Sequence, residues 1–274
     1  MAYPTIDAPY GLKPVNLIGG QAYAGSTREY PILNNLGTGI FYGDLVALTR
    51  GNLQRISVTT GTAGTVVGVF LGCSYTDPNT NQKTFRQNYP ASTAAGDIVG
   101  IVADDPDLVF KAVVCSATTT VASGAQAMVG QNLAMINNTG STATGNSKNA
   151  VLAPDDTPAT TDALPLRMLS VVEDSMTSLG TATYASISTA TVTCSALPQA
   201  LVVGTDVGSL DSNGNYVASG SFVDTAASAG ATTFVLNQAP IATLNSTLVF
   251  RQYPEVLVKL NFGQHEYYDA TGTA

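Results

Sequence analysis

The chain has 274 residues, 45% of them hydrophobic and only 11% charged, and its formal net charge is −8 at pH 7. That length is enough for one large domain or two smaller ones, and the apolar content excludes an intrinsically disordered chain. The eleven Lys and Arg residues are spread along the sequence, which argues against direct nucleic-acid binding because phosphate neutralisation needs clustered cations.

The residue types favour strands and turns. Thr, Val and Ala are interrupted by 26 Gly and 13 Pro, which is typical of short strands and tight turns. Cys73, Cys115 and Cys194 are widely spaced, so we interpret them as small apolar side chains and predict neither a disulfide framework nor a zinc site. Met1 is followed by no signal-peptide pattern, and no apolar run approaches the roughly 18 residues of a membrane span. We expect a protein made in a reducing cytoplasm, without membrane contact.

Residues 1–31 are expected to form an extended arm. Four prolines interrupt this stretch and oppose a helix, yet it is too apolar for a free tail. Such an arm can pack on its own domain or on a neighbouring subunit, and the pattern leaves both open. At an interface its side chains would supply a large contact area, and the candidates for partner binding are Tyr3, Tyr10, Leu12 and Tyr23.

Residues 43–76 predict the first β unit. A strand over 45–48 is followed by a turn at Gly51-Asn52, a second strand over 53–56, a spacer of small residues and a third strand within 65–76. A polar, turn-rich loop comes next, at 75–83. Because loops carry contacts more often than cores do, we predict partner binding in this region, by Tyr75, Asp77, Phe85, Arg86 and Tyr89.

The Gly-Asp start of this unit recurs at Gly96-Asp97, before an apolar strand over 98–102. We interpret the repeat as a framework device, because Gly-Asp before a strand is common turn chemistry. A partner strand is predicted over 110–115. Residues 125–137 favour strand–turn–strand over a helix, because Gly-Gln-Asn interrupts the helical pattern. Residues 166–172 predict another strand.

Residues 180–248 differ in composition from the rest. Their only charged side chains are Asp206, Asp211 and Asp224, and an Asn-Gly pair at 213–214 indicates a β-hairpin. We predict an inserted or protruding β module. The chain then returns through an alternating strand over 255–262, which we expect to rejoin the main sheet beside 166–172.

The sequence therefore predicts an all-β fold with a small β-barrel or sandwich core, an extended N-terminal arm and an inserted β module. The arm is assigned to 1–31, the main domain to 32–179 plus 249–274, and the module to 180–248.

No pattern in the chain indicates an enzyme, a cofactor or a metal. His265 is the only histidine, which opposes a zinc triad, and we expect it at a surface or interface. Asp104, Asp105 and Asp107 are clustered oxygen donors suited to calcium, but their spacing is that of an ordinary acidic turn and not of an EF-hand. No Gly-x-Ser-x-Gly elbow and no phosphate-binding loop is present. We therefore predict no catalytic residue.

Three stretches carry a resemblance to a known group of proteins. Residues 7–21, residues 65–78 with their Val-Gly-Val-Phe core and Tyr-Thr-Asp-Pro end, and residues 102–107 resemble virion structural proteins of tailed bacteriophages, particularly marine ones, found beside the major capsid protein. The Gly-Asp-Leu-Val unit is similar to the small β-barrels of capsid decoration, or cement, proteins. The resemblance covers 1–175 and the last twenty residues, and none of its motifs is catalytic.

The resemblance implies a protein of the virion that binds the outer capsid surface and clamps neighbouring major capsid subunits. It would act as a homo-oligomer, with a trimer favoured, and contacts spread over many subunits would add by avidity. A head-fibre, tail or adhesin protein that uses 180–248 to bind a host surface is the alternative. A secreted glycan-active enzyme is opposed by the absence of Trp and the scarcity of Glu. The major capsid protein is opposed by the lack of a long helical pattern.

Overall fold

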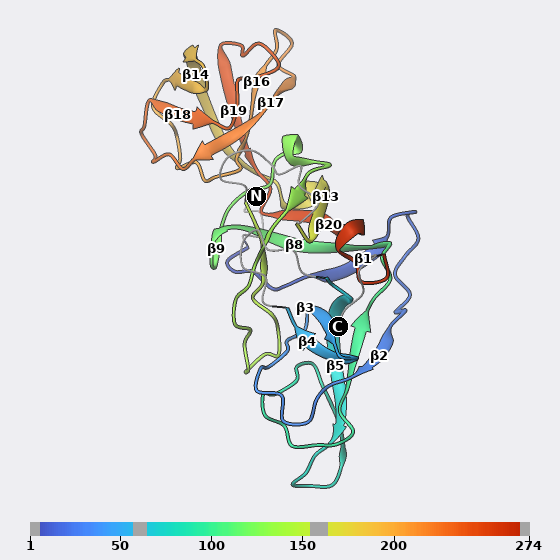
Figure 1. Ribbon diagram of the computed structural model, residues 1–274. Coiled ribbons are helices and arrows are strands. Elements are labelled where there is room, and N and C mark those ends of the chain that lie inside the picture. The colour runs from blue at the N-terminus through green and yellow to red at the C-terminus, as the bar shows by residue number, and fades with distance from the viewer. Residues whose placement is uncertain (1–5, 57–64, 154–163, 269–274) are drawn as a thin grey trace.

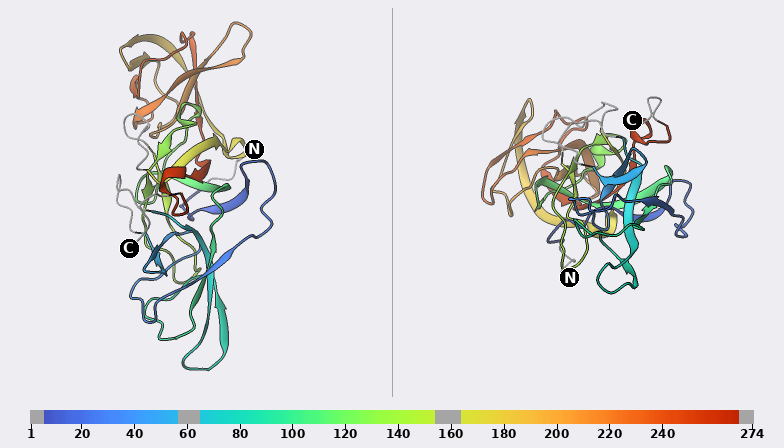
Figure 2. Two further views of the ribbon diagram at one scale, coloured as in Figure 1. Left: turned by 45° about the vertical axis from the view of Figure 1, so that its right-hand side comes forward. Right: turned by 60° about the horizontal axis from the view of Figure 1, so that its bottom comes forward.

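The computed structural model describes residues 6–56, 65–153 and 164–268. These residues form twenty β-strands and three short 3-10 helices, which confirms the predicted all-β class. The molecule is elongated and consists of three β units along its long axis (Figure 1). A six-stranded sheet lies at one end, an eight-stranded sheet in the middle and a closed barrel at the other end. Figure 2 shows the same succession from a second side.

The six-stranded sheet contains the β unit predicted from residues 43–76. Its order is β2-β7-β5-β3-β4, and β6 pairs with β5. The strands are β2 (Arg28–Pro31), β3 (Leu45–Thr49), β4 (Asn52–Arg55), β5 (Gly68–Thr76), β6 (Lys83–Arg86) and β7 (Val99–Ala103). Arg50 and Gly51 both have positive φ between β3 and β4, as a two-residue hairpin of the primed type requires. The turn therefore lies one residue before the predicted one.

A separate apolar core fills this sheet. Val46, Leu53, Phe70 and Val102 are buried in it. A Cβ on Gly100 would lie 2.6 Å from the Leu53 side chain, so β7 needs glycine there for Leu53 to enter the core.

The eight-stranded sheet forms the middle of the molecule. Its order is β10-β13-β20-β8-β12-β11, and β1 and β9 also pair with β8. The strands are β1 (Lys13–Leu17), β8 (Leu108–Ala117), β9 (Thr120–Val121), β10 (Asn132–Leu133), β11 (Met135–Ile136), β12 (Ala150–Leu152), β13 (Leu166–Val171) and β20 (Glu255–Leu260). β13 and β20 pair antiparallel from Leu166–Leu260 to Val171–Val256, as predicted when the alternating strand at 255–262 was expected to rejoin the sheet beside 166–172.

One expected strand in this unit is wrong. The segment 125–137 begins with a 3-10 helix, η1 (Gln126–Met128), and only then forms the short strands β10 and β11. Met128 is buried in the large core and ties this turn to the sheet. The largest core cluster joins the two sheets, since it includes Leu45 and Val69 from one and Phe110 and Val258 from the other.

The closed barrel has the strand order β14-β15-β18-β17-β16-β19. Its strands are β14 (Thr177–Ser188), β15 (Thr191–Cys194), β16 (Asp206–Leu210), β17 (Tyr216–Thr225), β18 (Thr233–Leu236) and β19 (Thr247–Gln252). The barrel contains the whole 180–248 segment and extends beyond it, because β14 and β19 pair from Thr177–Gln252 onwards. The predicted hairpin is present between β16 and β17, where the Asp211 carboxylate accepts hydrogen bonds from the Asn213 and Asn215 amides.

The N-terminal region is not a free arm in the part that is described. β1 pairs with β8 and β2 pairs with β7, so residues 13–17 and 28–31 belong to the two sheets of their own chain. For these residues, the structure shows the alternative in which the N-terminal stretch packs on its own domain. Pro14 lies beside a register shift and Pro31 ends an edge strand, and both are places where a sheet tolerates proline.

Candidate functional site

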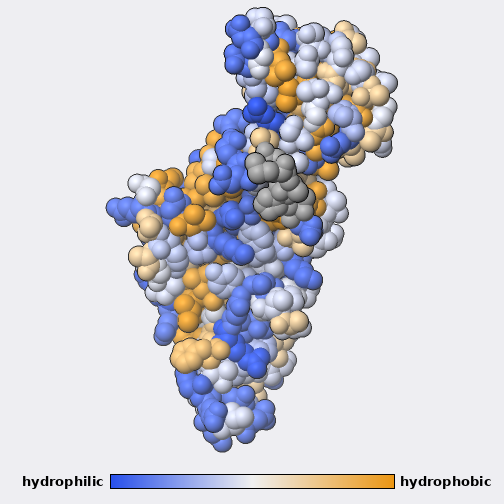
Figure 3. All heavy atoms as spheres, turned by 180° about the vertical axis from the view of Figure 1, so that it is seen from behind, coloured by the Kyte–Doolittle hydropathy of each residue, from blue (hydrophilic) through white to orange (hydrophobic). Residues whose placement is uncertain are grey.

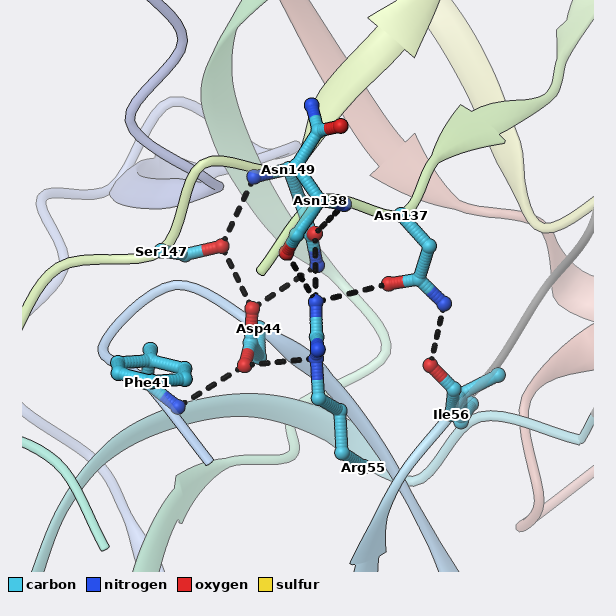
Figure 4. A network of polar contacts seen from close by, with 8 residues as sticks. All are labelled: Phe41, Asp44, Arg55, Ile56, Asn137, Asn138, Ser147 and Asn149. Carbon is cyan, nitrogen blue, oxygen red and sulfur yellow. Dashed lines mark hydrogen bonds and ion pairs between the residues drawn. The ribbon is translucent and has the colours of Figure 1, made fainter. Parts of the chain in front are cut away.

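A buried polar network joins the six-stranded sheet to the loop 137–149 (Figure 4). Asp44 comes directly before β3 and has no exposed surface. One carboxylate oxygen accepts a hydrogen bond from the Phe41 amide at 2.9 Å and pairs with Arg55 Nε at 3.0 Å. The other accepts hydrogen bonds from Ser147 Oγ at 2.6 Å and Asn149 Nδ2 at 2.9 Å. Both oxygens of the buried carboxylate are therefore satisfied.

Arg55 extends this network along the loop. Its Nη2 donates to Asn137 Oδ1 at 3.2 Å and Asn149 Oδ1 at 3.0 Å, and also to the Asn138 carbonyl. Desolvation raises the pKa of Asp44, and Arg55 and the Ser147 hydroxyl oppose that shift. The fully buried Asp44 carboxylate at the centre of this network binds only groups of its own chain. It fixes the loop to the sheet, in line with the interpretation of Gly-Asp as a framework device.

In the second Gly-Asp pair, Asp97 is exposed and holds a hairpin, whereas Asp44 in the first pair is buried. The Asp97 side chain accepts hydrogen bonds from the Thr76 amide at 2.9 Å and the Thr76 hydroxyl at 2.7 Å. Lys83 Nζ lies 3.1 Å away. These interactions, the Thr76 amide first, lower the pKa of Asp97 to about 2. Asp97 thus holds Thr76 and Lys83, the last strand pair before the turn of the β5–β6 hairpin, at the end of the molecule farthest from the barrel (Figure 1).

Three of the predicted contact residues lie on this hairpin. Phe85 and Arg86 are exposed on β6, and 75% of the Phe85 surface is free. Asp77 starts the turn of the hairpin, where its carboxylate accepts the Asn79 amide at 2.8 Å. Asp77, Phe85 and Arg86 therefore all lie on this hairpin, with the side chains of Phe85 and Arg86 on opposite faces of β6.

Three other predicted contact residues are buried in the chain, and their assignment to a partner surface is wrong. Tyr75 and Tyr89 belong to the core of the six-stranded sheet, and Leu12 belongs to the large core. The Tyr89 hydroxyl donates to the Leu36 carbonyl at 3.2 Å. They adjoin polar segments in sequence, but the backbone turns their side chains inward.

The two described tyrosines among the predicted contact residues of the N-terminal region, Tyr10 and Tyr23, make contacts within the chain. Tyr10 donates its hydroxyl proton to Glu255 Oε1 at 2.5 Å, and Lys13 Nζ lies 4.1 Å from the centre of its ring. Tyr23 is half-buried against the large core, and its hydroxyl donates to the Ser26 carbonyl. Tyr3 lies outside the described residues.

His265 is buried, which corrects the expectation of a surface position. Its Nδ1 accepts the Tyr267 amide at 3.2 Å, so its Nε2 carries the proton and donates to the Asp104 carbonyl at 3.2 Å. Desolvation lowers the pKa of His265, against the attraction of Asp104. The ring holds the chain after β20 onto the loop between β7 and β8.

The acidic turn at 104–107 directs its carboxylates to separate partners. Asp104 is buried and accepts hydrogen bonds from the hydroxyls of Tyr30 and Tyr267, and Arg28 Nε lies 3.0 Å away. Asp105 accepts the Asp107 amide at 2.9 Å. Within the described ranges, no three His, Cys, Asp or Glu side chains are grouped so as to hold a metal ion.

Exposed apolar side chains outside the predicted set form the rest of the candidate contact surface. Ile241, in the loop before β19, is 84% exposed, and Phe262 stacks on Tyr268 with ring centres 4.0 Å apart. Figure 3 shows apolar surface over the middle unit and on the barrel. Sequence reasoning missed Ile241 and Phe262 because isolated apolar residues next to turns give no periodic signal.

The comparisons with known proteins give no family to this chain. No protein-family model matches it, and no curated protein and no solved structure does so either. Among the described residues, no helix is long and apolar enough to cross a membrane. Function is therefore argued from the geometry of the chain.

Proposed function

We propose that the protein is a non-enzymatic structural component of a virion that binds the outer capsid surface and cements neighbouring major capsid subunits. The observation that carries the proposal is the position of the contact groups. Phe85 and Arg86 are exposed on the hairpin at one end, and Ile241 is exposed on the barrel at the other. Two contact regions at opposite ends of one β-built molecule can touch two neighbouring subunits, and linked weak contacts add by avidity.

Rigidity supports the same function. The Asp44 network fixes the loop 137–149, and the barrel is closed and therefore offers no free strand edge. The resemblance at residues 7–21, 65–78 and 102–107 points to the same class of virion protein. In this proposal the chain assembles as a homo-oligomer on the shell, with a trimer favoured.

Readdition of purified protein to capsids that lack it tests the proposal. The double variant Phe85→Ser, Arg86→Ser should lower occupancy about tenfold, because exposed aromatic and arginine anchors dominate protein interfaces. Capsids carrying the wild-type chain should withstand heat and osmotic shock better than bare capsids. The matched control is the double variant Leu33→Ser, Arg50→Ser, which removes an exposed apolar side chain and an exposed arginine outside the hairpin. Wild-type protein that leaves capsids unbound, or binds without stabilising them, would sink the proposal.

The barrel favours a second candidate, a head-fibre, tail or adhesin protein that binds a host surface. The barrel lies at one end of the molecule. The exposed Ile241 lies in its loop between β18 and β19, and residues 180–248 contain few charged side chains. Binding of the labelled full-length chain to host cells separates this function from cementing. Cell binding that is lost with Ile241→Asp and kept with Phe85→Ser would support the adhesin, and absent cell binding would reject it.

A further inference from the structure

A pocket of about 460 Å³ lies beside the buried polar network, at the edge of the six-stranded sheet. Phe41 and Pro90 provide apolar wall, and Arg55, Arg86, Asn88 and Thr142 provide polar groups. The pocket lining contains two guanidinium groups and no carboxylate. This combination of an apolar wall with a few convergent polar groups is that of a small-molecule or side-chain site.

Arg55 is held rigidly at this pocket but keeps one nitrogen free. Its Nε and Nη2 are occupied by Asp44 and by the loop 137–149. No described residue accepts a hydrogen bond from Nη1, and 13% of the side chain is exposed. The network therefore positions a guanidinium edge at the pocket wall with no rotational freedom to lose on binding.

Arg86 gives the pocket a positive charge that no described carboxylate neutralises. It is exposed on β6, and within the described part of the chain no carboxylate forms an ion pair with it. Asp44 neutralises Arg55 from behind at 3.0 Å. The pocket thus has one net positive charge, which suits a monoanion better than a phosphate dianion. A guanidinium fork also matches the planar geometry of a carboxylate.

We propose that this pocket binds a carboxylate borne on a short apolar group. Arg86 forms the ion pair, Arg55 Nη1 and the Asn88 amide are the further donors, and the apolar group packs on Phe41 and Pro90. The same chemistry is presented by a free small carboxylic acid and by the carboxyl terminus of a peptide. The proposal does not depend on the capsid function, because it concerns the isolated chain.

Titration of the full chain with three probes, followed by amide chemical shifts, tests the site. The probes are butyrate, N-acetyl-leucine and N-acetyl-leucine amide. We expect shifts at the amides of Gly39 and Asn88 with the acids and none with the neutral amide. Tighter binding of N-acetyl-leucine than of butyrate assigns the site to a peptide terminus, and the reverse assigns it to a free acid. Equal shifts with acid and amide, or none with either acid, would overturn the proposal.

Two variants locate the binding. Arg86→Gln should weaken acid binding about tenfold or more, since it removes a charge-assisted hydrogen bond, and the fold should persist because the side chain is exposed. Arg50→Gln is the matched control, as Arg50 is an exposed arginine in the β3–β4 turn and is not part of the pocket lining. Arg55→Lys removes the Nη1 donor while keeping the charge beside Asp44, and it should weaken the acid further in the Arg86→Gln background. Unchanged affinity in Arg86→Gln would contradict the assignment.

Discussion

At the scale of single residues, buried polar side chains hold the segments of this protein together. Asp44, Asp206 and His265 are each nearly or fully inaccessible, and each has polar partners within the chain. A buried polar group is stable only while its partners are present, since an unsatisfied one has a large desolvation cost. These three residues therefore give the sharpest predictions on stability.

Asp44→Asn should destabilise the fold by about 3–5 kcal/mol, because it leaves Arg55 buried without a counter-ion. Urea unfolding of the variant and the wild type measures the difference. The control is Asp174→Asn at an exposed position, which should change stability by less than about 0.5 kcal/mol. A small effect of Asp44→Asn would mean that Arg55 finds another partner.

Asp206 should make the fold less stable as pH rises. Burial raises its pKa to about 6, against the Tyr216 hydroxyl and Arg251, which favour the charged form. The folded chain therefore binds this proton more tightly than the unfolded chain, and stability falls between about pH 4 and pH 6 by up to about 3 kcal/mol. In Asp206→Asn this loss should disappear, as seen by comparing urea midpoints at both pH values. An unchanged pH profile in the variant would refute the assignment.

His265 acts in the opposite direction. Its pKa is lowered, so the neutral ring stabilises the folded chain fully above pH 6.5 and this contribution is lost as pH falls. Protonation would place a proton on Nδ1, which accepts the Tyr267 amide. Hydrogen exchange of that amide should therefore be faster relative to intrinsic rates at pH 5 than at pH 7.5. In His265→Gln this dependence on pH should vanish, and its survival there would point to another group.

At the scale of elements, side-chain caps hold hairpins and loops at fixed angles. The β5–β6 hairpin depends on Asp97, which binds both the amide and the hydroxyl of Thr76 as well as Lys83. Asp97→Ala should raise hydrogen exchange in residues 77–82 while leaving the urea midpoint of the whole chain nearly unchanged. Lys83→Ala is the matched control with a smaller effect, because it removes only an exposed ion pair. Equal exchange in both variants would show that Lys83, not Thr76, is the important partner.

Sequence reasoning succeeded where a strand alternates or a turn signal is clear. β20 was predictable because its apolar residues recur at period two, and the β16–β17 hairpin was predictable from the Asn-Gly pair at 213–214. It failed for β1 and β2, since prolines at edges and bulges look like breaks in a strand. The sequence patterns also could not predict which side chains point into the core. Tyr75 and His265 are buried by contacts with distant segments, and a local pattern contains no record of these contacts.

At the scale of the whole molecule, the barrel and the two sheets are separate units that meet around Phe222. The barrel has its own core, around Phe234 and Phe250, whose rings meet edge to face at 5.5 Å. Phe222 on β17 belongs instead to the large core of the sheets, next to the loop in which the Ser123 amide donates to the Val203 carbonyl. Phe222 therefore couples the unfolding of the barrel to that of the rest of the molecule.

Phe222→Ala should separate thermal unfolding into two transitions. The truncation costs about 3–5 kcal/mol of packing, and most of this loss falls on the contact between the barrel and the sheets. Scanning calorimetry of the wild type should show one cooperative transition. The matched control is Phe234→Ala, which lies inside the barrel core and should lower the stability of the barrel itself. A single transition in Phe222→Ala would show that the units are coupled elsewhere.

The way the barrel is attached has a consequence for how such chains diversify. β13 and β20 are neighbours in the middle sheet, paired up to Val171–Val256, and the barrel starts from the adjoining pair Thr177–Gln252. The chain therefore leaves the sheet and comes back to it at one place. A different closed domain whose termini lie side by side can be exchanged at this point without shifting the register of the sheet. Recombination, or a display vector, can replace residues 177–252 if the new domain also fills the place of Phe222 in the large core.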